Sequence, residues 1–429
     1  MIVERPFKRL SPLTPLVRSF LLVVAVLASS WDDILRGDIG PLAWVLLALL
    51  VAGAAYGAVS WWRTKYWIEA DELRVDTGVV SRQSRRIRVD RLQGIDIVQP
   101  FVARVFGLAE LKMDVAGGGR REGSLAFLPL KEAQSLRETL LAQRDAVRAS
   151  RTTPEQTRPA AERVLARLDL STLVVSLLLS PETVGFAVAA LVVGGLFVAF
   201  GETSGVAGVL PVLGGFVVTA FRRLSAFYGF TVAETAAGLQ VRRGLFDRNV
   251  QTITVARVQG VVVSEPWMWR GFGWARLDVA VAGYAGSSGD GAPSASTVMP
   301  VADRALVFWL ARRLLEASGA PDPAEVRLTG PPDRARWVSP VRRRFLASGV
   351  GEALLVSREG MLTRRTHVVP HARVQSLQVK QGPWQRRWGL ADLQVDSPPG
   401  PVSVRARHRD EVEARGLLDR ANALARAHR

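Results

Sequence analysis

The feature that most constrains this chain is a motif that occurs three times. It reads RLQGIDIVQPFVARVFGLAELKMDVAG at 91–117, RVQGVVVSEPWMWRGFGWARLDVAVAG at 257–283 and RVQSLQVKQGPWQRRWGLADLQV at 373–395. The frame aligns Arg91 with Arg257 and Arg373, Arg104 with Arg270 and Arg386, and Gly107 with Gly273 and Gly389. A frame repeated in this way predicts three copies of one small structural unit.

Each copy has the same outline. Strand-like alternation precedes the motif at 66–75, 236–246 and 352–362, and the motif itself reads as two strands joined by a short helical turn. A helix with leucines on one face follows each motif, at 131–148 (Leu136, Leu140, Leu141), 301–317 (Leu306, Leu310, Leu314) and 408–426 (Leu417, Leu418, Leu424). We therefore expect α+β or mainly-β units, each a small β-barrel or sandwich capped by a C-terminal helix.

The apolar residues gather in a few runs. The net charge is +17, yet the mean hydropathy is +0.15. Residues 41–62 carry no charge and are long enough to cross a bilayer core of roughly 30 Å. Residues 20–31, extended back to about Leu13, would complete a first helical hairpin. Runs at 184–200 and 205–221 predict a second hairpin, although a buried soluble helix is the alternative for 184–200. We expect 170–180 to be interfacial or a helix extension.

The flanking charges predict an orientation. Basic residues stand at all four ends of the two hairpins: Arg5, Lys8, Arg9, Arg18, Arg63, Lys65, Arg163, Arg167, Arg222 and Arg223. By the positive-inside rule these ends face the cytoplasm, so we expect a multi-pass cell-membrane protein with its folded units inside. The first run, followed by Ala28-Ser29-Ser30, also resembles a signal peptide. A retained anchor is favoured because the basic lead is long and a second apolar run follows.

The motif and outline resemble a known family. The units look like pleckstrin-homology (PH) domains, and the motif at 91–117 resembles the bacterial PH domains of YdbT-like membrane proteins. Those proteins combine membrane hairpins with repeated PH domains, and the resemblance covers nearly the whole chain. It implies an architecture, while the family has no assigned biochemical activity. The third copy departs from the pattern, with SPPG at 397–400 and no apolar run at 337–351.

These patterns together predict the domain organisation. We expect a transmembrane hairpin at 1–64, PH-like units at 65–148, 224–318 and 341–429, a second hairpin at 170–223, and linkers at 149–169 and 319–340.

Few residues could carry chemistry. The chain has no cysteine, which excludes disulfides, thiol catalysis and zinc ribbons. His367 and His371 are four apart, but the segment around Pro370 reads as strand, which separates them by roughly 13 Å. His408 and His428 have no partners in the sequence. The 116–123 loop lacks the Lys-Ser/Thr of a phosphate loop and reads as a hairpin turn. We predict no enzyme activity, no cofactor and no metal.

The basic residues are the candidate binding groups. They are almost all Arg, a bias that codon composition can also produce. The clusters proposed for lipid headgroups lie outside the repeated frame, except for Arg386, which belongs to it: Arg82, Arg85, Arg86, Arg88, Arg242, Arg243, Arg364, Arg365, Arg386 and Arg387. A solvated Arg-rich face is the alternative. For the repeated Arg91, Arg257 and Arg373 a structural role is favoured over headgroup binding, and the repeated glycines predict tight turns with positive φ. Phe101, Trp267, Trp269 and Trp384 read as core or as interfacial groups.

The function we expect is non-enzymatic binding or scaffolding at the inner leaflet. The PH-like units would contact anionic lipid headgroups or a protein partner, which includes other copies of the chain. The alternative is a small transporter or channel component, although no charge lies within 41–62, 184–200 or 205–221. Nucleic-acid binding is disfavoured, because no helix concentrates Arg on one face.

Overall fold

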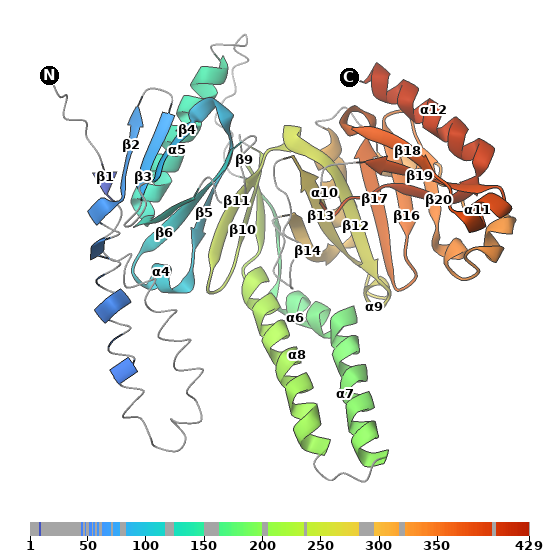
Figure 1. Ribbon diagram of the computed structural model, residues 1–429, viewed down its shortest axis with the longest axis horizontal. Coiled ribbons are helices and arrows are strands. Elements are labelled where there is room, and N and C mark those ends of the chain that lie inside the picture. The colour runs from blue at the N-terminus through green and yellow to red at the C-terminus, as the bar shows by residue number, and fades with distance from the viewer. Residues whose placement is uncertain are drawn as a thin grey trace. The chain divides into compact units, whose positions relative to one another are not determined.

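The computed structural model describes residues 8–9, 62–69, 72–77, 83–115, 124–149, 163–199, 205–235, 238–282, 296–316, 322–396 and 400–428, with scattered positions between 44 and 59. The chain divides into a first part, Met1–Pro159 with Phe246–Thr252, and a second part, Ala160–Leu245 with Ile253–Arg429 (Figure 1). The first helix of the predicted first hairpin lies outside the described residues, and only scattered positions of its second helix are described.

The first part contains the first repeat. Its elements are β1 (Lys8–Arg9), β2 (Lys65–Glu69), β3 (Glu72–Thr77), β4 (Gln83–Arg88), β5 (Leu92–Gln99), α4 (Phe101–Val105), β6 (Leu108–Val115), β7 (Ser124–Pro129) and α5 (Leu130–Ala149). Strands β1 to β4 form one antiparallel sheet, and β5, β6 and β7 form a second. The segment 66–75, where the sequence shows strand-like alternation, forms the hairpin β2–β3.

The second part holds the helices and most of the second and third repeats. Its second-repeat elements are β8 (Arg163–Arg167), α6 (Leu170–Leu178), α7 (Pro181–Ala199), α8 (Gly205–Phe227), β9 (Thr231–Thr235), β10 (Gly238–Arg243), β12 (Val258–Pro266), α9 (Trp267–Arg270), β13 (Trp274–Val281), β14 (Thr297–Asp303) and α10 (Arg304–Glu316). The third repeat has β15 (Ala347–Val350), β16 (Leu354–Glu359), β17 (Thr363–Pro370), β18 (Ser376–Lys380), α11 (Pro383–Arg387), β19 (Leu390–Asp396), β20 (Arg405–Asp410) and α12 (Glu411–Ala427).

The apolar helices are inserted inside a repeat instead of preceding it. β8 pairs antiparallel with β9, and α6, α7 and α8 lie between these two strands in the sequence. The predicted linker 149–169 therefore includes a strand. β1 pairs with β2 in the same way around the predicted first hairpin. In the third repeat β15 and β16 pair directly, with only residues 351–353 between them. Both ends of an inserted helical segment are thus held by neighbouring strands.

Helices α7 and α8 pack together and leave apolar side chains exposed. Phe186 and Phe216 meet edge to face, with ring centroids 5.8 Å apart. Among the described residues, Val209–Phe227 of α8 is long and apolar enough to cross a membrane, and α6 with α7 qualifies only as one bent span, with a 42° angle at the break. The sequence predicted 184–200 as a span by itself. Leu191 of α7 is 76% exposed, so these helices are not the core of a soluble fold.

The repeated glycines perform one task in all three repeats. Gly107, Gly273 and Gly389 have φ of 68°, 67° and 59°, as predicted. Each carbonyl accepts a hydrogen bond from the first N–H of the closing helix, at 3.0 Å from Leu130, 2.7 Å from Arg304 and 3.0 Å from Glu411. The turn therefore ties the short helix to the start of the capping helix.

The closing helices begin and end close to the predicted positions. α5 and α10 bury leucines, among them Leu140 and Leu314. α12 instead buries Ala414, Ala421 and Ala425, while its predicted core leucines are only half-buried. Alanine lets this helix lie closer to its sheet than leucine would.

Gly389→Ala tests the turn within the third repeat. A Cβ meets only the end of the Arg334 side chain, so the cost comes from the positive φ and should be about 1–2 kcal/mol in the free energy of unfolding. Gly416→Ala is the matched control, because Gly416 lies in α12 with open space around it, and we expect it to stabilise by about 0.5–1 kcal/mol. Thermal unfolding of both variants measures the difference in stability. Equal shifts in melting temperature would contradict the requirement for glycine at this positive-φ turn.

Candidate functional site: an arginine-lined cleft beside the apolar helices

A cleft of about 430 Å³ lies in the second part of the chain, where the apolar helices meet the sheet. The break between α6 and α7 and the end of α8 form one side, and β12, β13 and the start of β17 form the other. Both charged and apolar side chains line it. The cleft therefore joins the second and third repeats to the helical segment.

A row of polar side chains crosses the sheet at the cleft. Ser264 of β12 is paired with Arg276 of β13 on one side and with Arg365 of β17 on the other. Residues paired across strands point to the same face, and neighbouring strands lie about 4.8 Å apart. The two arginines therefore start about 10 Å apart around a central hydroxyl, a spacing that lets both guanidinium groups reach one phosphate-sized anion.

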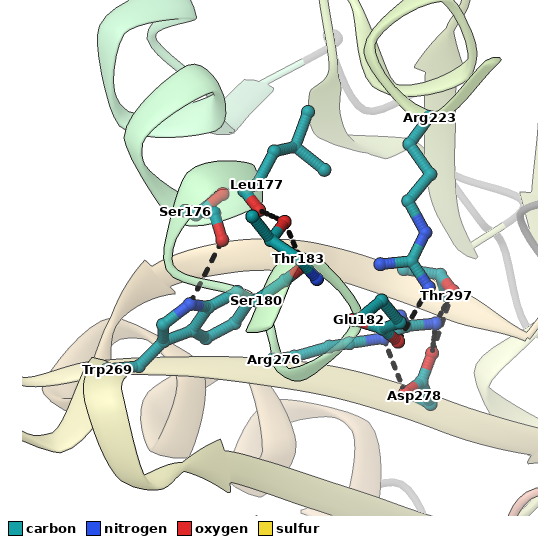
Figure 2. Close-up of polar contacts among 10 residues, drawn as sticks. All are labelled: Ser176, Leu177, Ser180, Glu182, Thr183, Arg223, Trp269, Arg276, Asp278 and Thr297. Carbon is teal, nitrogen blue, oxygen red and sulfur yellow. Dashed lines mark hydrogen bonds and ion pairs between the residues drawn. The ribbon is translucent and has the colours of Figure 1, made fainter. Parts of the chain in front are cut away.

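The two arginines differ in their partners. Arg276 donates to both carboxylate oxygens of Asp278, at 2.8 and 2.9 Å, and to Thr297 Oγ1 at 2.9 Å (Figure 2). These bonds fix its guanidinium. Arg365 is exposed, and its side chain makes no hydrogen bond or ion pair with the described residues. Ser264 is thus flanked by one guanidinium group that is fixed by protein partners and one that is available to a ligand.

The helical side of the cleft carries an ion pair. Arg223 of α8 donates to Glu182 of α7 at 2.9 Å (Figure 2). Ser180 precedes α7, and its Oγ accepts from the Thr183 N–H at 3.3 Å. The first turn of α7 therefore faces the cleft with its positive end. The lining residues together present three guanidinium groups, of Arg223, Arg276 and Arg365, against two carboxylates.

Trp269 attaches the helices to the sheet. It is the buried residue of α9, and its Nε1 donates to the carbonyl of Ser176 in α6 at 3.1 Å (Figure 2). The bend between α6 and α7 is therefore held against the second repeat by a buried hydrogen bond.

A second group of arginines surrounds Glu265, which is buried in β12. Arg304 lies 3.1 Å from one carboxylate oxygen and Arg364 lies 4.0 Å from the other. Burial and then the charge of Arg364 lower the pKa of Arg358, and the same two causes lower the pKa of Arg270. Positive charge therefore exceeds the single carboxylate here, and the local field favours an added anion.

Exposed apolar side chains lie beside these arginines. Trp267 begins α9 and Phe272 follows it, and Met361 and Leu362 lie in the β16–β17 turn, where the Leu362 carbonyl accepts from the Trp267 N–H at 2.7 Å. In the second part of the chain, α9 lies on the side of the sheets from which α7 and α8 extend (Figure 1). An apolar tip with an Arg-rich border is typical of a membrane-water interface.

The sequence-predicted headgroup candidates do not meet in one place. Only Arg365 lines the cleft, and Arg364 points to the opposite face of β17 beside Glu265. The others lie on separate elements: Arg85, Arg86 and Arg88 exposed on β4, Arg242 exposed on β10, and Arg386 and Arg387 exposed on α11. Arg243 is only 7% exposed, so we remove it from the candidates. Arg82 lies outside the described residues.

The repeated arginines end equivalent short helical turns, at Val89–Arg91, Val255–Arg257 and His371–Arg373. Arg257 donates to the Ala282 carbonyl and Arg373 to the Ala256 carbonyl. These contacts support the structural role favoured for them. Arg91 is exposed at the same position.

Other predicted residues are distributed differently. Trp269 is buried, but Phe101, Trp267 and Trp384 are exposed, so these three are not core residues. His367 lies in β17 and His371 in the following turn, both buried. Among the described residues, no group of three or more His, Asp or Glu could hold a metal ion.

Sequence reasoning missed Arg276, Ser264 and Glu182 as cleft residues. Arg223 was noted only for orientation. Nothing near these positions in the sequence indicates that they converge, because the pairing of β12 with both β13 and β17 brings them together. The one available signal is that Arg276 lies within the repeated motif at a position that is charged in all three copies, with Glu110 and Asp392 as its counterparts.

Comparison with known proteins agrees with this fold. The model of the bacterial PH domain matches residues 19–144, 178–318 and 336–424. The chain belongs to the bacterial PH domain family. A relative, the UPF0699 transmembrane protein YdbT of Bacillus subtilis (strain 168), is 25% identical over 265 residues, which are 56% of this chain and 53% of the relative. The chain thus spans about half the length of that protein. No solved structure matches. The family and the apolar helix α8 together indicate a membrane protein with PH-like domains.

Proposed function

We propose that this chain is a non-enzymatic, multi-pass membrane protein whose PH-like domains lie on the cytoplasmic side and bind anionic phospholipid headgroups. The observation that carries this is the row Arg276–Ser264–Arg365 at the foot of α7 and α8. A headgroup phosphate in the cleft would sit near the point where a lipid-exposed helix leaves the bilayer.

The surroundings of the cleft support the same assignment. The exposed tip of Trp267, Phe272, Met361 and Leu362 offers apolar area to the acyl boundary. The arginines around Glu265 add positive charge next to it. Each Arg close to an anionic leaflet contributes about 1 kcal/mol, so the group would hold this face against the membrane. The basic residues next to the apolar runs are the reason for the cytoplasmic orientation.

Arg365→Gln is the variant that tests the headgroup site. The full chain in neutral detergent is titrated with short-chain phosphatidylglycerol, followed by calorimetry. We expect the variant to bind about tenfold more weakly, because a charge-assisted hydrogen bond to phosphate is lost. Arg387→Gln is the matched control: it removes an exposed arginine of α11 outside the cleft and should leave the affinity within about twofold.

Two further results would count against the proposal. Short-chain phosphatidylcholine should bind the unaltered chain more weakly than phosphatidylglycerol, and equal binding would remove the preference for an anion. Affinity should also fall as salt rises, since part of the attraction is between exposed charges. An Arg365→Gln variant with unchanged affinity would contradict the site.

A further inference from the structure

The repeats are joined edge to edge by their strands. In the first part of the chain β5 pairs antiparallel with β11 (Arg248–Ile253), a strand of the next repeat. In the second part β12 pairs antiparallel with β17, again a strand of the next repeat. Each junction therefore uses the first strand of the motif in one repeat and the strand before the motif in the next.

The two junctions have one register. Ile97 lies opposite Val250 in the first, and Val263 lies opposite Thr366 in the second. Ile97 and Val263 each follow the repeated Arg of their own motif by six residues, while Val250 and Thr366 each precede the repeated Arg of the next motif by seven. The pairing is therefore a property of the repeat and not of one particular pair of strands.

The third repeat has the same joining edge without a following repeat. β18 is its equivalent of β5 and β12, and among the described strands its only neighbour is β19. Leu377 and Val379 are half-buried there, whereas their counterparts Val261 and Val263 in β12 are at most 1% exposed. This difference in burial is expected when no neighbouring strand covers the edge of β18.

The first repeat has the opposite edge without a preceding repeat. β4 is its equivalent of β11 and β17, and β3 is its only neighbour among the described strands. Ser84, Arg85 and Arg86 are all exposed on it. An edge of this kind is a template for another strand. The arginines do not prevent pairing, because β17 carries Arg364 and Arg365 and is paired on both sides.

We propose that β18 of one copy of this chain pairs antiparallel with β4 of a second copy, in the register of the two internal junctions. Val379 then lies opposite Ser84, and Gln378 lies opposite Arg85. The Gln378 amide donates to both carboxylate oxygens of Asp396, at 2.9 and 2.8 Å, so a carboxylate lies beside this edge. The proposed pairing brings the arginines of β4 next to it. The contact is head to tail, and it repeats from copy to copy as a ring or a row.

The absence of cysteine allows a direct test. One preparation of the full chain carries Ser84→Cys, another carries Val379→Cys, and the two are mixed in detergent under mild oxidation. We expect a disulfide-linked dimer in the mixture and none in either preparation alone. Lys380→Cys replaces Val379→Cys in the control mixture, because its side chain points to the other face of β18, and the dimer yield should fall at least several-fold.

Other outcomes overturn the proposal. No dimer in the mixture, or equal yields from the Val379→Cys and Lys380→Cys mixtures, excludes this register. The unaltered chain provides a measurement that needs no substitution: its mass by light scattering in detergent should rise from one chain to two or more with concentration. A mass that stays at one chain throughout contradicts the proposal whatever the variants do.

Discussion

Arg409→Met is expected to lower the free energy of unfolding of the third repeat by about 3–5 kcal/mol. Arg409 lies in β20 and is only 2% exposed, and burial lowers the pKa of its guanidinium. It donates to the carbonyls of Thr329 and Gly330, at 2.7 and 2.6 Å, and to the carbonyl of Ser348 at 2.8 Å. Methionine fills the volume but donates to none of these carbonyls, and those of Thr329 and Ser348 then keep the N–H donors of each other.

The contacts of Arg409 also explain what is lost. Thr329 and Ser348 form a β-bridge, so one side chain joins β20, β15 and the segment before it. That segment was predicted as part of a linker at 319–340, yet it is packed on the third repeat. Chemical unfolding of the full chain in detergent measures the change. Arg405→Met is the control, because Arg405 is exposed on the same strand, and it should cost less than about 0.5 kcal/mol. Equal effects of the two variants would contradict the role of Arg409.

The second large effect is a loss of stability in acid that depends on His367. Burial is the main cause that lowers its pKa from 6.5 to about 4. Arg365, Arg405 and Arg407 lower it further, and Glu359 opposes them. The folded chain therefore keeps this ring neutral where the unfolded chain protonates it. Stability is unaffected above pH 6.5 and falls as the pH drops from 6.5 to 4, by up to about 3 kcal/mol.

His367→Gln should remove this contribution. The second repeat carries Gln251 at the equivalent position, also buried, so the fold accommodates the side chain. We expect the variant to lose less stability than the unaltered chain between pH 6.5 and 4. A residual slope should remain, because burial also lowers the pKa of His371. Unfolding curves at pH 7, 5.5 and 4 give the comparison, and parallel losses in the two chains would contradict the assignment.

The repeated motif made much of the fold predictable. Its glycines, its short helical turn and the capping helices recur because each repeat must make the same backbone turn, and periodicity in the sequence reports that directly. The β1 and β8 strands were not predicted. Arg163–Arg167 is short and ends in arginines, so it lacks the alternation of a longer strand, and only its pairing with β9 defines it.

The candidate site was less predictable than the fold. Arg365 was selected as one arginine among ten, and nothing in the sequence distinguishes it from Arg364 on the other face of β17. The cleft depends on residues from 180 to 401 that meet through strand pairing and through the Trp269–Ser176 bond. The sequence also did not indicate that Arg243 and Arg409 are buried, because a buried arginine in a short basic strand has the same sequence pattern as a solvated one.

The central expectation is that an anionic lipid occupies the cleft. Native mass spectrometry of the full chain, released from bilayers of equal phosphatidylglycerol and phosphatidylcholine, identifies what remains bound. We predict that the unaltered chain retains phosphatidylglycerol preferentially and that Arg365→Gln retains markedly less of it, while Arg387→Gln behaves as the unaltered chain. Retention of both lipids in equal amounts, unchanged by Arg365→Gln, would contradict the account.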